Sequence, residues 1–309
     1  MFNRQQGFKL FKLFGIQVSL HPYWIVAAIY LVQLGRGTYD SILWSVAELL
    51  ALFGIVLMHE FGHALACRSV GGRADHILLW PLGGVAYVDP PARPGAMLWS
   101  IVAGPLVNAL LIPVLYFASR FALQLYEIDR ISEDAAKFIF MMKRINIGLL
   151  IFNMLPIYPL DGGQILRSLL WFVVGKARSL SIASVIGLVG AVGLVALALF
   201  ERSIWMGIMA FFAGSQAWRG FQMGKALRVI QNLPRRSHVQ CPSCRASAPI
   251  GEYWRCTCGR PIDIFAMSGN CLGCGARAQV VNCGDCGRAS PLAQWYGYGN
   301  MTTAAGIVN

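Results

Sequence analysis

Residues 59–63 read His-Glu-Phe-Gly-His, which is the H-E-x-x-H pattern of a helical zinc site. Side chains four residues apart on an α-helix lie one above the other, so the rings of His59 and His63 can reach one metal ion. Glu60 is rotated by about 100° and lies beside that ion. Two imidazoles leave room on a tetrahedral Zn²⁺ for a third protein ligand and a water molecule, the open arrangement of a catalytic site. Glu60 is then the predicted general base.

The setting of this motif favours a metal site over a chance match. The alternative is that both histidines are core residues and that Glu60 pairs with an arginine. However, the motif closes an apolar run that begins near Ser41 and reads as membrane-spanning. A charged group at the centre of such a span costs about 2.5–3.5 kcal/mol on insertion scales. Such residues persist mostly where function requires them.

A third ligand is predicted in the segment Leu-Pro-Ile-Tyr-Pro-Leu-Asp-Gly-Gly, residues 155–163. Asp161 is the one carboxylate in this apolar stretch, and a desolvated carboxylate is costly unless a cation lies against it. The alternative is that Asp161 is the N-cap of a helix that starts at Gln164, a frequent role for aspartate. The local sequence leaves both interpretations open, although the central helix supplies no other candidate ligand.

The segment 77–89 is apolar but too short to cross a bilayer, and it carries a proline and the pair Gly83-Gly84 in its middle. It is predicted to form a hairpin. Non-helical backbone at membrane depth is tolerated only against protein or a wet cavity, so this hairpin should line the active cleft. An exposed strand there can pair with an unwound peptide. The alternative is an ordinary cytoplasmic β-turn.

An asparagine is expected close to the metal site from the next apolar segment, residues 97–118. Gly104 in its first half lets another helix approach closely, and Asn108 can hydrogen-bond across that contact. Asn108 is therefore predicted to support a metal ligand, with packing alone as the alternative.

Eight of the nine cysteines follow residue 240, and they form four close pairs. Each two pairs complete one tetrahedral zinc site with four cysteine ligands, as in zinc ribbons. Taken in order, the first site holds Cys241, Cys244, Cys256 and Cys258, and the second holds Cys271, Cys274, Cys283 and Cys286. A crossed pairing remains open, and disulfides are the alternative chemistry, which a cytoplasmic location disfavours. The isolated Cys67 is expected to be a small packing residue.

Composition makes this a membrane protein. The chain has 309 residues, 56% hydrophobic and 13% charged, with a mean hydropathy of +0.56, whereas soluble domains are roughly 25% charged. The sequence predicts a mainly helical, polytopic fold of six transmembrane helices with a re-entrant β-hairpin-like loop and a small C-terminal zinc-ribbon domain. The six spans are expected at about residues 18–34, 41–66, 97–118, 145–160, 180–200 and 204–218. No cleavable signal is evident.

The basic residues predict the orientation of the chain. Lys225 and Arg228 follow the sixth expected span, as is typical of a cytoplasmic flank. We therefore expect a multi-pass protein of the cell membrane with both termini in the cytoplasm. Much of the net charge of +12 is topological, which makes a nucleic-acid partner unlikely. The predicted regions are a cytoplasmic N-terminal segment (1–16), the six-span domain (17–225), a linker (226–239), a double zinc ribbon (240–290) and a flexible tail (291–309).

Four motifs in order resemble the site-2 protease family of intramembrane zinc metalloproteases. They are residues 59–63, 81–86 (Pro-Leu-Gly-Gly-Val-Ala), 103–108 (Ala-Gly-Pro-Leu-Val-Asn) and 153–163. The resemblance covers about residues 15–225 and is greatest to the six-span branch that includes the sporulation-factor processing proteases.

The resemblance assigns roles to residues of this chain. It implies that His59, His63 and Asp161 bind zinc and that Glu60 is the general base. Asn153 would help to hold the substrate or the transition state. The re-entrant loop with Gly83, Gly84 and Val85 would bind the substrate.

The sequence thus predicts a metalloendopeptidase with one catalytic and two structural zinc ions. Its substrate would be a transmembrane protein, cleaved in or near a membrane-spanning segment, and the zinc ribbons would bind a protein partner. One alternative is a catalytically inactive membrane receptor or scaffold with structural zinc. A metal transporter is disfavoured because the fifth and sixth expected spans lack acidic or histidine residues.

Overall fold

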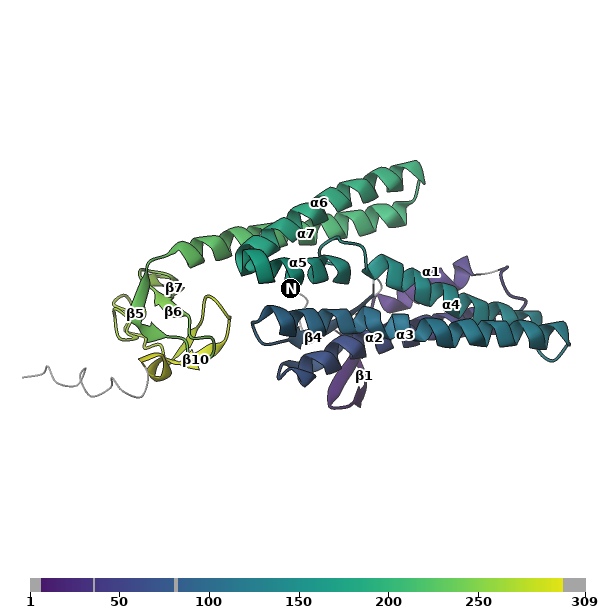
Figure 1. The fold of residues 1–309 in the computed structure, drawn as a ribbon, viewed down its shortest axis with the longest axis horizontal. Coiled ribbons are helices and arrows are strands. Elements are labelled where there is room, and N and C mark those ends of the chain that lie inside the picture. The colour runs from purple at the N-terminus through teal and green to yellow at the C-terminus, as the bar shows by residue number, and fades with distance from the viewer. Residues whose placement is uncertain (1–6, 36, 81–82, 297–309) are drawn as a thin grey trace, which may run out of the picture. The chain divides into compact units, whose positions relative to one another are not determined.

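The computed structural model describes residues 7–35, 37–80 and 83–296 of the chain (Figure 1). The chain divides into two compact units, Met1–Phe221 and Gln222–Asn309. The first unit is mainly helical, and the second is built from short strands. The division falls within the last helix, upstream of the linker predicted at residues 226–239.

Seven α-helices follow one another in the described residues (Figure 1). Three of them are long and apolar enough to cross a membrane: α2, α3 and α6. The helices are α1 (Trp24–Leu34), α2 (Ile42–Ser69), α3 (Pro94–Glu127), α4 (Glu133–Asn153), α5 (Asp161–Val174), α6 (Lys176–Phe200) and α7 (Ile204–Asn232).

Local sequence explains where the long helices begin. The side chain of Ser41 accepts a hydrogen bond from the Leu43 amide at 3.3 Å and caps α2. Ser132 caps α4 in the same way, by accepting from the Ala135 amide at 3.3 Å. α3 starts with Pro94, whose fixed φ suits a first helical turn.

Two of the six expected spans begin at the wrong residue. The first was expected from residue 18, but residues 16–20 form a strand and α1 starts only at Trp24. Ile16 and Val18 alternate with polar residues and are fully buried in a sheet, which overrides their hydropathy. The fourth was expected from residue 145, yet α4 starts at Glu133 because Ser132 caps it there.

The predicted hairpin exists, as one half of a larger sheet. β3 (Arg73–Trp80) and β4 (Gly83–Asp89) pair antiparallel, and residues 81–82 between them lie outside the described part of the chain. β2 (Ile16–Leu20) pairs parallel with β3, and β1 (Phe8–Leu13) pairs antiparallel with β2. The sheet order is therefore β1-β2-β3-β4, with β4 at one edge. We did not expect strands in the N-terminal segment.

The helices of the first unit pack as one connected set, in which α5 lies against both α3 and α6. α3 lies against both α2 and α4 (Figure 1). α6 and α7 run side by side in opposite directions, and small residues allow their close approach. A Cβ at Gly187 of α6, for instance, would lie 3.2 Å from the Cβ of Ala217 of α7.

The second unit, as far as residue 296, contains six short strands around an aromatic core. They are β5 (Arg235–Gln240), β6 (Ser247–Pro249), β7 (Trp254–Arg255), β8 (Pro261–Ile262), β9 (Val280–Asn282) and β10 (Ala289–Pro291). The 3₁₀-helix η1 (Leu292–Tyr296) follows. Within it Trp295 is 2% exposed and packs on Phe265, with ring centroids 5.1 Å apart. The flexible tail predicted from residue 291 therefore starts too early, because Trp295 belongs to the core.

Candidate metal centre

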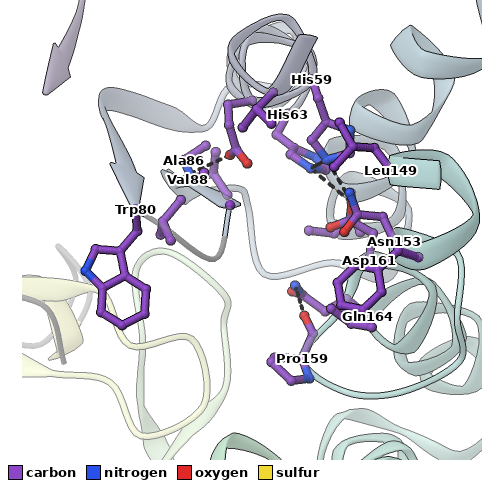
Figure 2. Close-up of a pocket in the computed structure, with 18 of the residues that line it drawn as sticks. His59, His63, Trp80, Ala86, Val88, Leu149, Asn153, Pro159, Asp161 and Gln164 are labelled. Atoms are coloured by element: carbon purple, nitrogen blue, oxygen red, sulfur yellow. Dashed lines mark hydrogen bonds and ion pairs between the residues drawn. The ribbon is translucent and has the colours of Figure 1, made fainter. Parts of the chain in front are cut away.

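Two histidines and one aspartate converge in the first unit. His59 and His63 point from adjacent turns of α2 toward Asp161, the first residue of α5 (Figure 2). Their Nε2 atoms are 3.0 Å apart. Asp161 Oδ2 lies 3.0 Å from His59 Nε2 and 3.4 Å from His63 Nε2. All three side chains are buried.

Each imidazole is fixed by its other ring nitrogen. His63 Nδ1 lies 2.9 Å from the carbonyl oxygen of Ser100, and His59 Nδ1 lies 2.6 Å from Oδ1 of Asn108. Both oxygens only accept hydrogen bonds, so both Nδ1 atoms carry the proton and donate. The Nε2 atoms therefore present lone pairs toward Asp161.

This donor set fits a zinc ion. Two nitrogen lone pairs and a carboxylate oxygen repel each other at these distances unless a cation lies among them. Asp161 Oδ2 is buried and receives no hydrogen bond from any described residue. Ligand bonds of about 2.0–2.1 Å in tetrahedral geometry place ligand atoms roughly 3.3 Å apart, which agrees with the separations here.

The structure decides between the two interpretations of Asp161. Helix α5 begins at Asp161 itself, and its N-cap residue is Leu160, without a side-chain capping bond. The carboxylate turns instead toward the two imidazoles. Asp161 therefore does not cap the helix, and its carboxylate remains the candidate third ligand.

Asn108 also lies where the sequence predicted, because it contacts His59 directly. Its orientation depends on Asn146 of α4, which we did not anticipate. Asn108 Nδ2 donates to Asn146 Oδ1 at 2.8 Å, and Asn146 Nδ2 donates to the Asn108 carbonyl at 2.9 Å. Both asparagines are fully buried. An amide side chain inside the expected fourth span is the signal that could have identified Asn146.

Glu60 lies beside the metal ligands and under strand β4. Its Oε2 accepts a hydrogen bond from the Ala86 amide at 2.7 Å (Figure 2). A Cβ at Gly84 would lie 2.5 Å from Glu60 Oε1, so only glycine lets the strand approach this closely. Ala86 is the register partner of Ile77 of β3 and lies on β4, an edge strand of the sheet.

A cavity of 420 Å³ opens onto these groups. The predicted substrate-binding residues Gly83, Gly84 and Val85 line it, and so does Asn153, the last residue of α4. Gln216 of α7 is a further polar lining residue that the sequence analysis missed. Trp80 and Phe212 of α7 also line the cavity and contact each other, with ring centroids 5.9 Å apart.

The cysteines of the second unit form two groups of four, but not in the predicted order. The first pair joins the fourth, as Cys241, Cys244, Cys283 and Cys286, and the second joins the third, as Cys256, Cys258, Cys271 and Cys274. The in-order pairing was therefore wrong. A contact that does not involve the sulfur atoms also joins the first pair to the fourth. Arg235, which precedes the first pair, forms an ion pair with Asp285, which lies between Cys283 and Cys286.

The sulfur separations distinguish metal ligands from disulfides. The closest contacts between pairs are 3.8 and 3.7 Å in one group and 3.5 and 3.9 Å in the other. A disulfide needs about 2.05 Å. Four thiolates around one zinc ion, each bonded at about 2.3 Å, lie roughly 3.8 Å apart. The distances match the metal geometry.

Comparisons with known proteins agree with this site. The family model described as peptidase family M50 matches residues 47–128 and 122–197. A zinc metalloprotease of Methanocaldococcus jannaschii is 32% identical over 225 residues, which are 73% of this chain and 63% of the relative. Stage IV sporulation protein FB of Bacillus subtilis is 32% identical over 49% of this chain and 46% of its own length.

A solved structure shares the fold over most of this chain. The site-2 protease from Methanocaldococcus jannaschii matches with a TM-score of 0.52 and 28% sequence identity, covering 70% of this chain and 95% of that one. The chain spans between about half and two thirds of the length of the curated relatives. The family match ends at residue 197, before α7 and the cysteine-rich unit.

Proposed function

Because the chain belongs to peptidase family M50, the site-2 protease family, we propose that it is a zinc metalloprotease that hydrolyses a peptide bond in or near a transmembrane segment of its substrate. One observation carries this proposal. His59, His63 and Asp161 converge from two helices, with Glu60 beside them, in a cavity of the membrane unit.

His59, His63 and Asp161 would hold the catalytic ion. When bound, zinc lowers the pKa of a water molecule to about 7 and polarises the substrate carbonyl. Glu60 accepts the proton of the attacking water and returns it to the leaving amine. Asn108 and the Ser100 carbonyl keep both imidazoles in the tautomer that leaves Nε2 free.

The substrate segment is held in extended form. A helical peptide has its carbonyls already bonded, so it must unwind before hydrolysis. Strand β4 supplies a free edge beside Glu60, and its residues Gly83, Gly84 and Val85 would pair with the unwound segment. Asn153 lies in the same cavity and would donate its side-chain amide to a substrate carbonyl.

Substitution of the general base tests the enzymatic proposal. Glu60→Gln keeps the shape of the side chain but cannot accept a proton. We expect the variant to retain zinc, to lose cleavage by roughly 10²–10⁴-fold and to trap uncut substrate, which mass spectrometry can identify.

Glu201→Gln, in the turn after α6, is the matched control and should cleave normally. Undiminished cleavage by the Glu60→Gln variant would remove Glu60 from this role. Absence of any trapped or cleaved protein in cells would favour the receptor or scaffold.

We further propose that the protein is a multi-pass protein of the cell membrane with six membrane-inserted helices and both termini in the cytoplasm. α2, α3 and α6 satisfy the requirements of length and hydropathy. α4, with 21 residues, and α7, with 29, are also long enough to cross about 30 Å of hydrocarbon. α1 has 11 residues and is shorter, about 16 Å.

The two cysteine groups would hold one structural zinc ion each, in addition to the catalytic ion. The unit that they form would dock a protein partner, such as the substrate. Deletion of residues 240–309 tests the docking proposal. We expect the truncated protein to cleave a generic unwound segment but to lose its choice among membrane substrates in a proteome-wide comparison. Unchanged substrate choice would contradict docking.

A further inference from the structure

The four cysteine pairs of the second unit occupy turns of one repeated backbone design. In each turn, the residue after the second cysteine has a positive φ and donates its amide to the carbonyl of the first cysteine. These residues are Arg245, Gly259, Gly275 and Gly287, and the four hydrogen bonds measure 2.8–2.9 Å. Each turn therefore presents two sulfur atoms together, so each pair enters a metal site as a unit.

The turns meet in nested order. The sulfur atoms of Cys241 and Cys286 are 3.8 Å apart, which joins the first turn to the fourth. Those of Cys258 and Cys271 are 3.9 Å apart, which joins the second turn to the third. The second and third turns lie, in the sequence, within the loop that the first and fourth close.

Contacts outside the sulfur atoms fix the outer pairing. Arg235 donates two hydrogen bonds to the Asp285 carboxylate, at 2.7 and 3.2 Å, and Asp285 lies between Cys283 and Cys286. A bidentate pair of this kind fixes orientation as well as distance. These contacts involve no ligand of the inner group, so the outer group has supports of its own.

The inner group is more exposed than the outer group. Cys258 and Cys274 are exposed, Cys256 is half-buried, and only Cys271 is buried. In the outer group two ligands, Cys241 and Cys283, are buried in the aromatic core, whereas Cys271 is the one inner ligand buried there. Removal of the inner ion should therefore leave the core and the outer ligands in place.

We infer that the unit binds two zinc ions in nested sites. The outer site, formed by the first and fourth turns, closes the unit, and it keeps its ion when the inner site, formed by the second and third turns, is empty. The inference rests on the proposal that the cysteine groups hold zinc, and it does not depend on proteolysis. It joins the first cysteine pair to the fourth and the second to the third, whereas the predicted in-order arrangement joins the first to the second and the third to the fourth.

Removal of one turn tests the nesting in the full-length protein. The double variant Cys256→Ser and Cys258→Ser is purified in detergent with its metal, and zinc per chain is counted by elemental analysis. Reactive thiols are then located by alkylation and mass spectrometry. We expect the loss of one zinc ion and new alkylation at Cys271 and Cys274 only, while the four outer cysteines stay protected.

Each other outcome overturns part of the inference. New alkylation at Cys241 and Cys244 would establish the in-order pairing. Alkylation of all six remaining cysteines of the unit, with loss of two ions, would show that the outer site needs the inner one. Iron in place of zinc in the unsubstituted protein would overturn the identity of the metal.

Cys67→Ser is the matched control, because Cys67 lies buried on α2 and donates to the Arg73 carbonyl at 3.5 Å. It should keep the full zinc content. The unsubstituted protein separates the two proposals. If all eight cysteines of the unit react and only one ion is found, structural zinc fails. If the cysteine-bound ions are present without proteolysis, only the catalytic proposal fails.

Discussion

At the scale of single residues, the metal centre depends on an amide that no motif contains. Asn146 accepts a hydrogen bond from Nδ2 of Asn108 and donates one to the backbone carbonyl of Asn108. The side-chain atom of Asn108 that faces His59 is therefore Oδ1. This fixes the proton of His59 on Nδ1. The nitrogen that faces Asp161 is consequently left free to bind a metal ion.

Asn146→Leu should weaken the membrane zinc site. Leucine has a similar size but no polar atoms, so Asn108 could turn its amide toward His59 and reverse the tautomer. We expect roughly 10–100-fold weaker zinc binding at this site, measured by competition with a chelator while the cysteine-bound ions remain. Asn232→Leu, at the exposed end of α7, is the control. Equal affinities in both variants would remove Asn146 from its positioning role.

At the scale of elements, α3 reaches the metal site because it carries glycine where it crosses α2. A Cβ at Gly104 would lie 2.3 Å from His63 Nε2 and 2.8 Å from His59 Nε2. The sequence predicted close packing at this position. The structure shows that the partner surface is formed by the two imidazole nitrogens that face Asp161.

Gly104→Ala should therefore expel the membrane zinc ion or displace its ligands. Alanine normally stabilises a helix relative to glycine by about 0.4–1 kcal/mol, and Gly148→Ala on α4, where a Cβ meets open space, should behave in that way. We expect the Gly104 variant to lose one zinc ion and its proteolysis while both variants remain folded in detergent. Full zinc content in the Gly104 variant would contradict this close approach.

The sheet is the element that the sequence revealed least. Hydropathy assigned residues 18–23 to a membrane span, although Val18 pairs with Phe11 of β1 on one side and with Ile77 of β3 on the other. A buried strand and the start of a buried helix are both apolar, so a short run cannot distinguish them. The pairing partner of β2 lies more than 50 residues away in β3, and only the tertiary structure brings it there.

At the scale of the molecule, the sheet constrains how the first two helices cross the membrane. β2 precedes α1, β3 follows α2, and the two strands pair. At the opposite end, the Asp40 amide donates to the buried Asp134 carboxylate at 3.1 Å. α1 and α2 must therefore leave the sheet and return to it, which makes their number of crossings even.

Reporter fusions test the resulting topology. We expect a reporter inserted at residues 129–131, between α3 and α4, to lie on the same side as one at residues 201–203, between α6 and α7. A reporter after residue 296 should lie on the opposite, cytoplasmic side, because Lys225 and Arg228 flank the preceding helix. A reporter at 129–131 that shares the side of the C-terminal one would contradict this arrangement.

The sequence alone determined the chemistry, because ligand types and helical spacing are local properties. His59, Glu60 and His63 follow from one turn of helix, and the cysteine pairs follow from their turns. Only the tertiary structure decided which distant groups meet: Asp161 with the two imidazoles, Asn146 behind Asn108, and the first cysteine pair with the last. These pairings depend on side-chain packing and on contacts such as that between Arg235 and Asp285, which leave no periodic signal in the chain.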